Sequence, residues 1–410
     1  MANTLKLGAG KWATGTDTVL AFNDENNNFK PLPFDFSRAS SATVVNQSGL
    51  IETVGSGEPR IDFLGNTKGA LLLEPTRTNK VIYEDFTQWT NYNASAVLSE
   101  ETIYGKNAYK IVEDSTLNNH GLYLTNLFTA NGTNYIWSVY VKGGERRYVV
   151  LTGRTGISSN DSAVIFDTQD GVWTLDVSSQ NQAFSAESVG NGWWRIAIEG
   201  NPTSGAYDSY TIAASLGGTT YTDANYQGDG TSGIYVAMAQ LEAGSYATSY
   251  IPTSGQSGGV TRVLDACSQT TPSSVIGQTE GVLFIDADYK NSAGDQTILI
   301  GVSGFNDYMF IQMNSSNVLE TGIVVNTTEV ARIGVGKTSG RYKCAFAYAN
   351  NDFVFYVNGV QVGTDTSGSM SGFAVDTINL NHNSKGYSIN NHLLYNTRLS
   401  NAELQALTTI

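Results

Sequence analysis

Two carboxylates two positions apart in a strand-like segment are the residues whose type and spacing best suit catalysis. Asp286 and Asp288 lie in the apolar segment 282–289, and residues i and i+2 of a strand share a face roughly 7 Å apart. Inverting glycosidases separate their carboxylates by about 6.5–9.5 Å. Catalytic carboxylates usually come from different strands, however, so that they flank the bond to be broken. The alternating apolar residues predict instead that both aspartates lie on the solvent face.

Other catalytic and metal-binding patterns lack parts. The chain has three histidines and two cysteines, with neither the His-x-x-x-His nor the Cys-x-x-Cys spacing of zinc sites. It also contains no phosphate loop of the Walker type. We therefore expect no enzymatic activity and no cofactor. A polysaccharide depolymerase or glycosidase stays open as an alternative, and it would need a carboxylate pair placed in a cleft.

Aromatic residues suggest a different chemistry. Trp193 and Trp194 are adjacent on a predicted strand, so one faces the core and the other faces outward. We take Trp194 as the outward ring, because the apolar face of a sugar covers an exposed indole well. Tyrosines in the following loop-like sequence extend this candidate glycan-binding patch: Tyr207, Tyr210, Tyr221 and Tyr226. The alternative to a glycan-binding patch is the commoner arrangement in proteins. In it a loop or a neighbouring protomer covers Trp194, and the tyrosines pack against their own loops.

Calcium is the remaining ligand to consider. Ca²⁺ takes carboxylate, amide and backbone oxygens, and two segments carry such groups near one another: Asp223 and Asp229 in one, and Asp376, Asn379 and Asn381 in the other. Both sets have little charge for a divalent cation. They are kept as candidate metal ligands only.

The composition restricts the partners. The 410-residue chain has a net charge of −14, which disfavours binding to nucleic acids and to anionic membranes. No apolar run reaches the length of a transmembrane helix, and the first residues lack the apolar core of a signal peptide. The two cysteines, Cys267 and Cys344, cannot form a disulfide framework. We expect a protein made in the cytosol and not inserted into a membrane.

The predicted fold class is all-β. The chain contains 43 glycines and 22 tyrosines, and no long segment with helical periodicity precedes the last dozen residues. Asn358-Gly359 suits a type I′ turn in a hairpin over 353–362. Ser400 and Glu403 form a capping box, which predicts one short C-terminal helix.

The segment 228–253 reads as a glycine-rich loop, a buried strand and a sharp exit. Strict alternation predicts that Tyr235, Ala237, Ala239 and Leu241 point to one side of this strand. Pro252 prevents further sheet pairing, because it has no amide hydrogen. The string YVAMAQLEAGSYATSYIPT (235–253) resembles the closing strand of a jelly-roll module of bacteriophage tail-fibre and virion adhesion proteins.

Further strings support the resemblance. FSRASSAT…GLIE (36–52) and LLLEPTRTN (71–79) resemble the N-terminal segment found ahead of such carbohydrate-binding-like modules. FYVNGVQVG (355–363) and LYNTRLSNAELQAL (394–407) resemble the laminin-G and concanavalin-A-like lectin family. The implied organisation has four parts: an N-terminal attachment and oligomerisation region at 1–80, a jelly-roll module at 81–255, a linker at 256–276 and a second β-sandwich at 277–410.

The resemblance implies a structural protein of a phage virion, a short head or tail fibre that carries lectin-like sandwiches on the virion surface. Its expected partners are copies of itself, as a trimer or else a dimer, and capsid or tail proteins bound through the N-terminal region. Host-surface glycans would be held by many weak contacts in parallel. A purely architectural virion protein without a ligand stays open, because function depends on the site and not on the fold.

Overall fold

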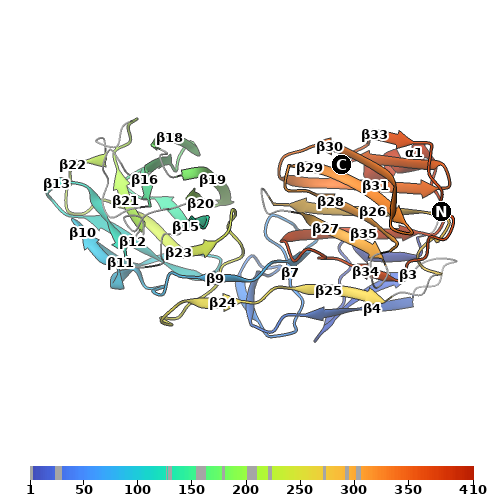
Figure 1. Ribbon diagram of the computed structural model, residues 1–410. Helices are drawn as coiled ribbons and strands as arrows, with labels where there is room; N and C mark the ends of the chain where they lie inside the picture. Colours follow the sequence, from blue (N-terminus) through green and yellow to red (C-terminus); the bar gives the residue numbers. More distant parts are fainter. Residues whose placement is uncertain are drawn as a thin grey trace. The chain divides into compact units, whose positions relative to one another are not determined.

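The chain forms two compact units, each built almost entirely of β-strands, in the computed structural model (Figure 1). Unit 1 comprises Met1–Thr76 and Val263–Ile410, and unit 2 comprises Arg77–Arg262. Unit 2 is therefore an insertion in the sequence of unit 1. The structure describes residues 3–23, 30–125, 127, 132–153, 163–177, 181–200, 210–219, 224–270, 274–290, 295–301 and 306–410. The predicted all-β class with one short C-terminal helix is confirmed.

Unit 1 is one continuous ladder of antiparallel strands that folds back on itself into a sandwich. The strands pair in the order β33 (Val360–Asp365), β32 (Asp352–Val357), β31 (Gly340–Ala349), β26 (Glu280–Tyr289), β35 (Tyr387–Tyr395), β1 (Leu5–Gly8), β3 (Thr18–Asn23), β4 (Lys30–Ser37), β25 (Ala266–Thr270), β34 (Thr377–Asn379), β27 (Gln296–Gly301), β28 (Tyr308–Met313), β29 (Val318–Val325) and β30 (Thr328–Gly336). β30 contacts β33, so the two ends of the ladder meet.

Short strands complete unit 1. β2 (Thr14–Gly15) pairs with β3, β7 (Ile61–Asp62) pairs with β8 (Ala70–Leu73), and β8 pairs with β35. β5 (Ala42–Val45) and β6 (Ile51–Val54) pair with each other as a hairpin. The predicted turn at Asn358-Gly359 joins β32 to β33 with positive φ at both residues, as a type I′ turn requires.

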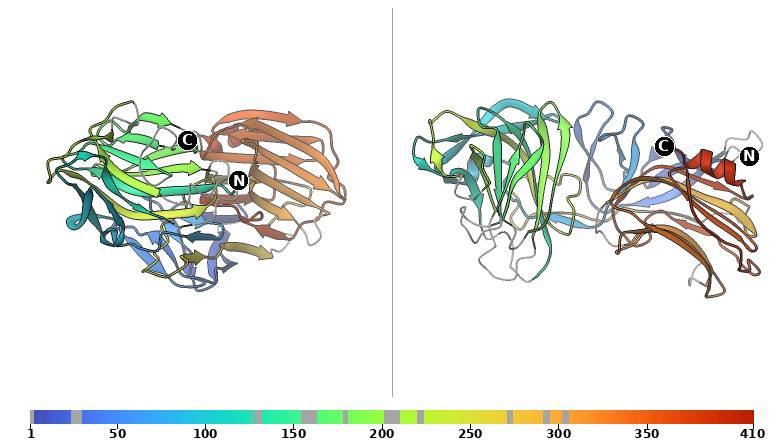
Figure 2. Two further views of the ribbon diagram at one scale, coloured as in Figure 1. Left: turned by 60° about the vertical axis from the view of Figure 1, so that its left-hand side comes forward. Right: turned by 90° about the horizontal axis from the view of Figure 1, so that it is seen from above.

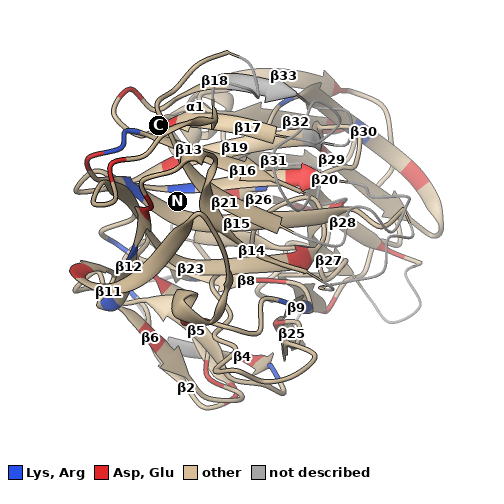
Figure 3. Cartoon of the chain, turned by 90° about the vertical axis from the view of Figure 1, so that its left-hand side faces the viewer, with Lys and Arg blue, Asp and Glu red and all other residues tan. Residues whose placement is uncertain are grey.

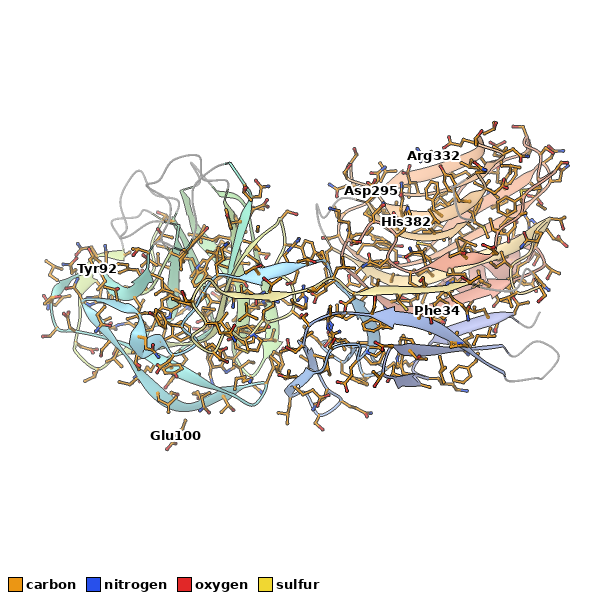
Figure 4. All side chains as sticks on the ribbon, turned by 60° about the horizontal axis from the view of Figure 1, so that its bottom comes forward. Phe34, Tyr92, Glu100, Asp295, Arg332 and His382 are labelled. Atoms are coloured by element: carbon orange, nitrogen blue, oxygen red, sulfur yellow. The ribbon has the colours of Figure 1, made fainter. Side chains whose placement is uncertain are left out.

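The core of unit 1 lies between the two halves of the ladder. Both halves contribute fully or almost fully buried side chains, among them Leu5, Phe34 (labelled in Figure 4), Cys267, Leu283, Ile298, Ile311, Leu319 and Phe346. Helix α1 (Asn401–Thr408) covers part of the outer face of one half (Figure 2). Leu404 of this helix and Phe284 of β26 belong to one buried cluster. The predicted capping box starts this helix, since the Ser400 hydroxyl accepts from the Glu403 amide.

The N-terminal residues are part of this sandwich, which corrects the expected separate region at 1–80. β1 and β8 both pair with β35, and β4 pairs with β25. Leu5 and Leu7 are fully buried in the shared core, so the segment has no core of its own. β25 lies in the expected linker 256–276, which is therefore not a free linker. The expected end of the first region, residue 80, lies close to the observed boundary between Thr76 of unit 1 and Arg77 of unit 2.

Unit 2 is a sandwich of two six-stranded antiparallel sheets. The outer sheet, as we call it, has the order β11 (Ala94–Ile103), β12 (Lys106–Glu113), β23 (Gly233–Ala243), β15 (Tyr135–Gly143), β20 (Trp193–Gly200) and β19 (Asn181–Gly190). The second sheet has the order β10 (Thr90–Tyr92), β14 (His120–Leu124), β21 (Tyr210–Ser215), β16 (Tyr148–Thr152), β17 (Ala163–Asp167) and β18 (Val172–Val177).

Three small elements complete unit 2. β9 (Arg77–Asn79) pairs with β24 (Val260–Arg262) where the chain enters and leaves the unit. β13 (Leu117–Asn118) pairs with β22 (Tyr226–Gln227), and Phe86–Gln88 form a single 3₁₀ turn. The core between the sheets is rich in large rings, including Trp89, Trp137 and Phe166. No helix in the described part of the chain is long and apolar enough to cross a membrane.

The closing strand of unit 2 departs from the predicted strict alternation. Ile234 and Val236 face the core before the bulge, and Ala239 and Leu241 face it after the bulge. Met238 has a φ of 49°, and the pairing with β15 shifts register at this point. A bulge of one residue moves the following side chains to the opposite faces. Gln240 consequently leaves the core and bonds the chain around residues 248–251.

A buried ionic cluster connects the two sequence segments of unit 1. The fully buried carboxylate of Asp265 accepts from Arg38 at 3.1 Å and from Arg60, and Arg60 also donates to Glu74 at 2.7 Å. The Glu74 amide donates to Asp265 at 2.8 Å. Burial opposes the charge of Arg60, but Asp265 and Glu74 together raise the pKa of its guanidinium above the ordinary value.

We expect Asp265→Ala to lower the free energy of unfolding of unit 1 by about 3–5 kcal/mol, because two buried guanidinium groups lose a partner. The matched control is Asp288→Ala, which removes a half-exposed carboxylate paired with Lys290 and should cost less than about 1 kcal/mol. Urea denaturation followed by circular dichroism measures both. Equal losses of unfolding free energy in the two variants would show that the buried cluster stabilises unit 1 no more than an exposed ion pair does.

Candidate functional site

A row of side chains crosses the outer sheet of unit 2. Lys110, Tyr235, Lys142 and Trp193 lie directly opposite one another in β12, β23, β15 and β20, and Val97 of β11 continues the row. Residues paired in this way share one face of a sheet. Lys110, Tyr235 and Lys142 are each adjacent in sequence to a core residue, namely Ile111, Val236 and Val141. Because successive side chains of a strand point to opposite faces, the row lies on the face turned away from the core.

A groove of about 620 Å³ lies over this row. Its lining combines aromatic, charged, amide and aliphatic side chains: Val97, Leu98, Ser99, Glu100, Glu101, Thr102, Lys110, Asn191, Trp193 and Tyr235. One wall comes from β11, where the pairing with β12 shifts register between Leu98 and Thr102. The intervening residues leave the regular ladder and carry Glu100, exposed at the rim (Figure 4).

Two aromatic rings define the floor. Trp193 is only 1% exposed, whereas Tyr235 is partly exposed and its hydroxyl makes no hydrogen bond to another described residue. The turn at Asn191-Gly192 has positive φ at both residues. This turn places Asn191 in the groove lining together with Trp193. The groove therefore offers one partly exposed ring, that of Tyr235, and a polar group at its edge.

Ion pairs fix the lysines of the row. Lys142 donates to Glu101 at 2.8 Å, and Lys110 contacts Glu145 at 2.7 Å and the Thr231 carbonyl oxygen at 3.1 Å. The hydrogen bond from Lys110 lowers the pKa of Glu145. Charges held in fixed positions lose little freedom when a ligand binds. The groove thus presents ordered hydrogen-bonding groups of both signs next to its aromatic floor.

Trp194, the ring expected to face outward, is partly exposed but packs against the core of unit 2. The two tryptophans do point to opposite faces, but Trp194 is the one on the core side. Its ring lies edge-on to Phe166 at a centroid distance of 5.3 Å, and its Nε1 donates to the Thr168 carbonyl oxygen at 2.9 Å. The partner ring in the groove is Trp193. Sequence alternation alone could not tell which of two adjacent tryptophans faces outward.

The described tyrosines of the predicted patch are buried. Tyr210 is 4% exposed in the core of unit 2, with its ring 5.3 Å from that of Trp137. Tyr226 is 5% exposed, and its hydroxyl donates to the Glu113 carboxylate at 2.6 Å. Neither lies in the groove. Tyr207 and Tyr221 fall outside the described residues.

The first candidate calcium segment is a loop stabilised by its own side chains. Asp229 accepts from the amides of Thr231 and Ser232, and from the Ser232 hydroxyl at 2.6 Å. These bonds, led by the Ser232 hydroxyl, hold the pKa of Asp229 well below its usual range. Arg146 lies 3.1 Å from the same carboxylate. Asp223 lies outside the described residues.

The second calcium segment is similarly engaged. Asp376 is exposed and accepts from the Thr377 hydroxyl, Asn379 accepts from the Asn381 amide, and Asn381 donates to the Asp265 carbonyl oxygen. Within the described residues, no group of three or more His, Cys, Asp or Glu side chains is arranged to hold a metal ion. The oxygens proposed as calcium ligands therefore serve turns and loop contacts here.

The aspartate pair on β26 is held by cations. The residues alternating with it face the core as predicted. Asp286 is 5% exposed and accepts two hydrogen bonds of 2.7 Å from Arg341, and Asp288 pairs with Lys290 at 3.2 Å. The two carboxylates of a glycosidase flank the bond to be broken, whereas these two lie on one strand and already bond to cations.

Comparison with known proteins identifies no family. No protein-family model and no curated protein matches the chain. The CBM40 module of the Ruminococcus gnavus IT-sialidase is 17% identical over 33% of this chain and 86% of that chain, with a TM-score of 0.29. Botulinum neurotoxin type C is 13% identical over 35% and 39% of the two chains, with a TM-score of 0.31.

The sialidase of Trypanosoma rangeli is 12% identical over 95% of this chain and 81% of that chain, with a TM-score of 0.28. The structural neighbours thus include a carbohydrate-binding module and β-rich sialidase and toxin chains. At TM-scores near 0.3 these likenesses decide neither the ligand nor the origin of this chain.

We expect Tyr226→Phe to lower the free energy of unfolding of unit 2 by about 1–3 kcal/mol, because the buried Glu113 carboxylate loses a hydrogen bond. The matched control is Tyr123→Phe, since Tyr123 is partly exposed on β14 and should tolerate the change within about 0.5 kcal/mol. Thermal unfolding by calorimetry measures both. A Tyr226→Phe protein as stable as the wild type would contradict the role of the hydroxyl.

Proposed function

We propose that this chain is a glycan-binding protein and that the groove of unit 2 holds the sugar. The observation that carries the proposal is the row Lys110, Tyr235, Lys142 and Trp193 at the floor of that groove. Sugars have apolar ring faces and polar edges. A site for them therefore needs an aromatic surface with ordered donors and acceptors around it.

The groove supplies these groups in suitable places. Tyr235 offers a partly exposed ring for the apolar face of a pyranose. Lys142 and Glu101, already paired at 2.8 Å, offer a donor and an acceptor to ring hydroxyls, and the Asn191 amide offers both. The exposed Val97 and Leu98, 46% and 61% exposed, form an aliphatic wall. Such an open groove favours weak binding, which becomes useful when many copies act together.

We further propose that the chain is displayed on the surface of a phage virion as a short head or tail fibre. The support for this is the sequence resemblance of residues 235–253, 36–52 and 71–79 to virion adhesion proteins. The fibre would be a homo-oligomer, a trimer or else a dimer, bound to capsid or tail proteins. Because residues 1–76 belong to unit 1, attachment through the N-terminal segment would use a surface of unit 1.

We expect Tyr235→Ala to weaken glycan binding about tenfold or more, the loss typical when an aromatic anchor of a sugar site is removed. A glycan array with the full chain would identify the ligand, and calorimetric titration would give the dissociation constants. The control is Tyr123→Ala, a partly exposed tyrosine of the second sheet, which should bind like the wild type. An array without any bound glycan would favour the architectural role.

The fibre proposal has a separate test. Light scattering of the purified chain at micromolar concentration should give the mass of a trimer or a dimer, three or two times the 44.0 kDa of one chain. A clean monomer at this concentration would contradict self-assembly of the chain by itself. Glycan binding by such a monomer would still support the groove, so the two parts of the proposal can fail independently.

A further inference from the structure

Unit 1 has a polar pocket of about 450 Å³ on the outer face of its sandwich. Three distant parts of the sequence surround it: the N-terminal loops at 9–10 and 65–69, the strands β26, β31 and β35, and the end of helix α1 at Leu407. Helix α1 covers the adjacent part of the same face through Phe284 and Leu404. The pocket is therefore the part of this face that the helix leaves open.

The floor of the pocket is again a row across paired strands. Lys343 of β31 and Asn391 of β35 both lie opposite Asp286 of β26. Asp286 is held by the two hydrogen bonds from Arg341. The Asn391 Oδ1 atom is buried and has no hydrogen-bond partner. A buried acceptor without a donor is uncommon, and Asn391 is one of the residues that line the pocket.

The wall formed by residues 65–69 is held in a fixed position. Asn66 donates to Asn390 at 2.6 Å, and its own Oδ1 accepts from the Lys68 amide at 3.0 Å. The Trp12 indole donates to the Lys68 carbonyl oxygen at 3.1 Å. Asn390 is 8% exposed, so the loop is attached to a buried group of the sheet. The backbone of Lys68 therefore needs little reorganisation to present its ammonium group to a ligand.

The charge around this pocket is opposite to that of the whole chain. Acidic residues are spread over many strands and loops (Figure 3), and the net charge is −14. The pocket lining instead contains Lys68, Arg341 and Lys343 with the single carboxylate of Asp286. Arg341 neutralises Asp286, which leaves Lys68 and Lys343 in excess. Lys343 reaches the Thr409 carbonyl oxygen at 2.7 Å, and a carbonyl does not cancel its charge.

We propose that this pocket binds an acidic sugar, a hydroxylated ring that carries one carboxylate or phosphate. The acidic group would lie between Lys68 and Lys343, and a ring hydroxyl would donate to the unsatisfied Oδ1 of Asn391. Hydrogen bonds from cations to an anionic group are stronger than those between neutral groups. The inference is independent of the groove in unit 2, since the two sites share no residue. It gives the chain a second glycan site with a preference for charge.

The test is calorimetric titration of the full chain with glucuronate, glucose 6-phosphate and glucose. Glucuronate and glucose 6-phosphate distinguish a carboxylate from a phosphate site, and glucose is the neutral control. We expect one or both acidic sugars to bind at millimolar concentration and glucose to bind much more weakly. Glucose binding as tightly as the acidic sugars, or no binding of either acidic sugar, would overturn the proposal.

Variants locate the binding. The double substitution Lys68→Gln and Lys343→Gln should raise the dissociation constant of the acidic sugar about tenfold or more, the effect of losing hydrogen bonds from charged groups. Asn391→Ala should raise it about fivefold. The matched control is Lys385→Gln, an exposed lysine of unit 1 outside the pocket. Because Lys68 is exposed, Lys68→Gln alone keeps the test valid if the double variant fails to fold.

The two glycan sites can be separated. Tyr235→Ala changes only the groove of unit 2, so it should leave acidic-sugar binding by the pocket unchanged. Loss of that binding in Tyr235→Ala, or full retention of it in the folded double lysine variant, would show that the acidic sugar binds elsewhere and would overturn the assignment.

Discussion

The buried carboxylate of Asp265 is the constraint on which the architecture of unit 1 depends. An ion without a partner in the protein interior is strongly destabilising. Asp265 is fully buried, and its carboxylate accepts from three groups of the first 76 residues: Arg38, Arg60 and the Glu74 amide. The two sequence segments of the unit must therefore come together for either to bury its charges. This requirement explains why the N-terminal segment is not an independent region, although its sequence looks like a separate module.

The same principle explains the most recognisable string of unit 2. Glu242 is fully buried and accepts from the amide and hydroxyl of Thr248, each at 2.6 Å. Gln240 bonds the Ile251 amide, and Asn79 donates to the Ile251 carbonyl oxygen. The polar residues of the segment 235–253 thus fasten the end of β23 to the chain that follows it. The string marks how the unit closes, and among the candidate ligand groups of the groove only Tyr235, its first residue, belongs to it.

A polar depression lies on the outer face of a sheet in each unit. In unit 2 a bulged edge strand borders an aromatic floor, and in unit 1 an N-terminal loop and a helix end border a floor of Asp286 and Asn391. The two differ in charge, since the groove balances Lys142 with Glu101 whereas the pocket has an excess of lysine. A chain with two dissimilar glycan sites would recognise a composite surface better than a single sugar, because linked weak sites add in effect.

The sequence by itself determined the all-β class, the hairpin turns at Asn191-Gly192 and Asn358-Gly359, and the capping box of α1, because each depends on neighbours within a few residues. It did not determine which tryptophan faces outward, where the Met238 bulge falls, or that Lys110, Tyr235, Lys142 and Trp193 form one row. These depend on strand register, and a shift of one residue moves every side chain to the other face. Only the tertiary structure decides register, since it is set by burying the core and pairing the charges of segments far apart in the chain.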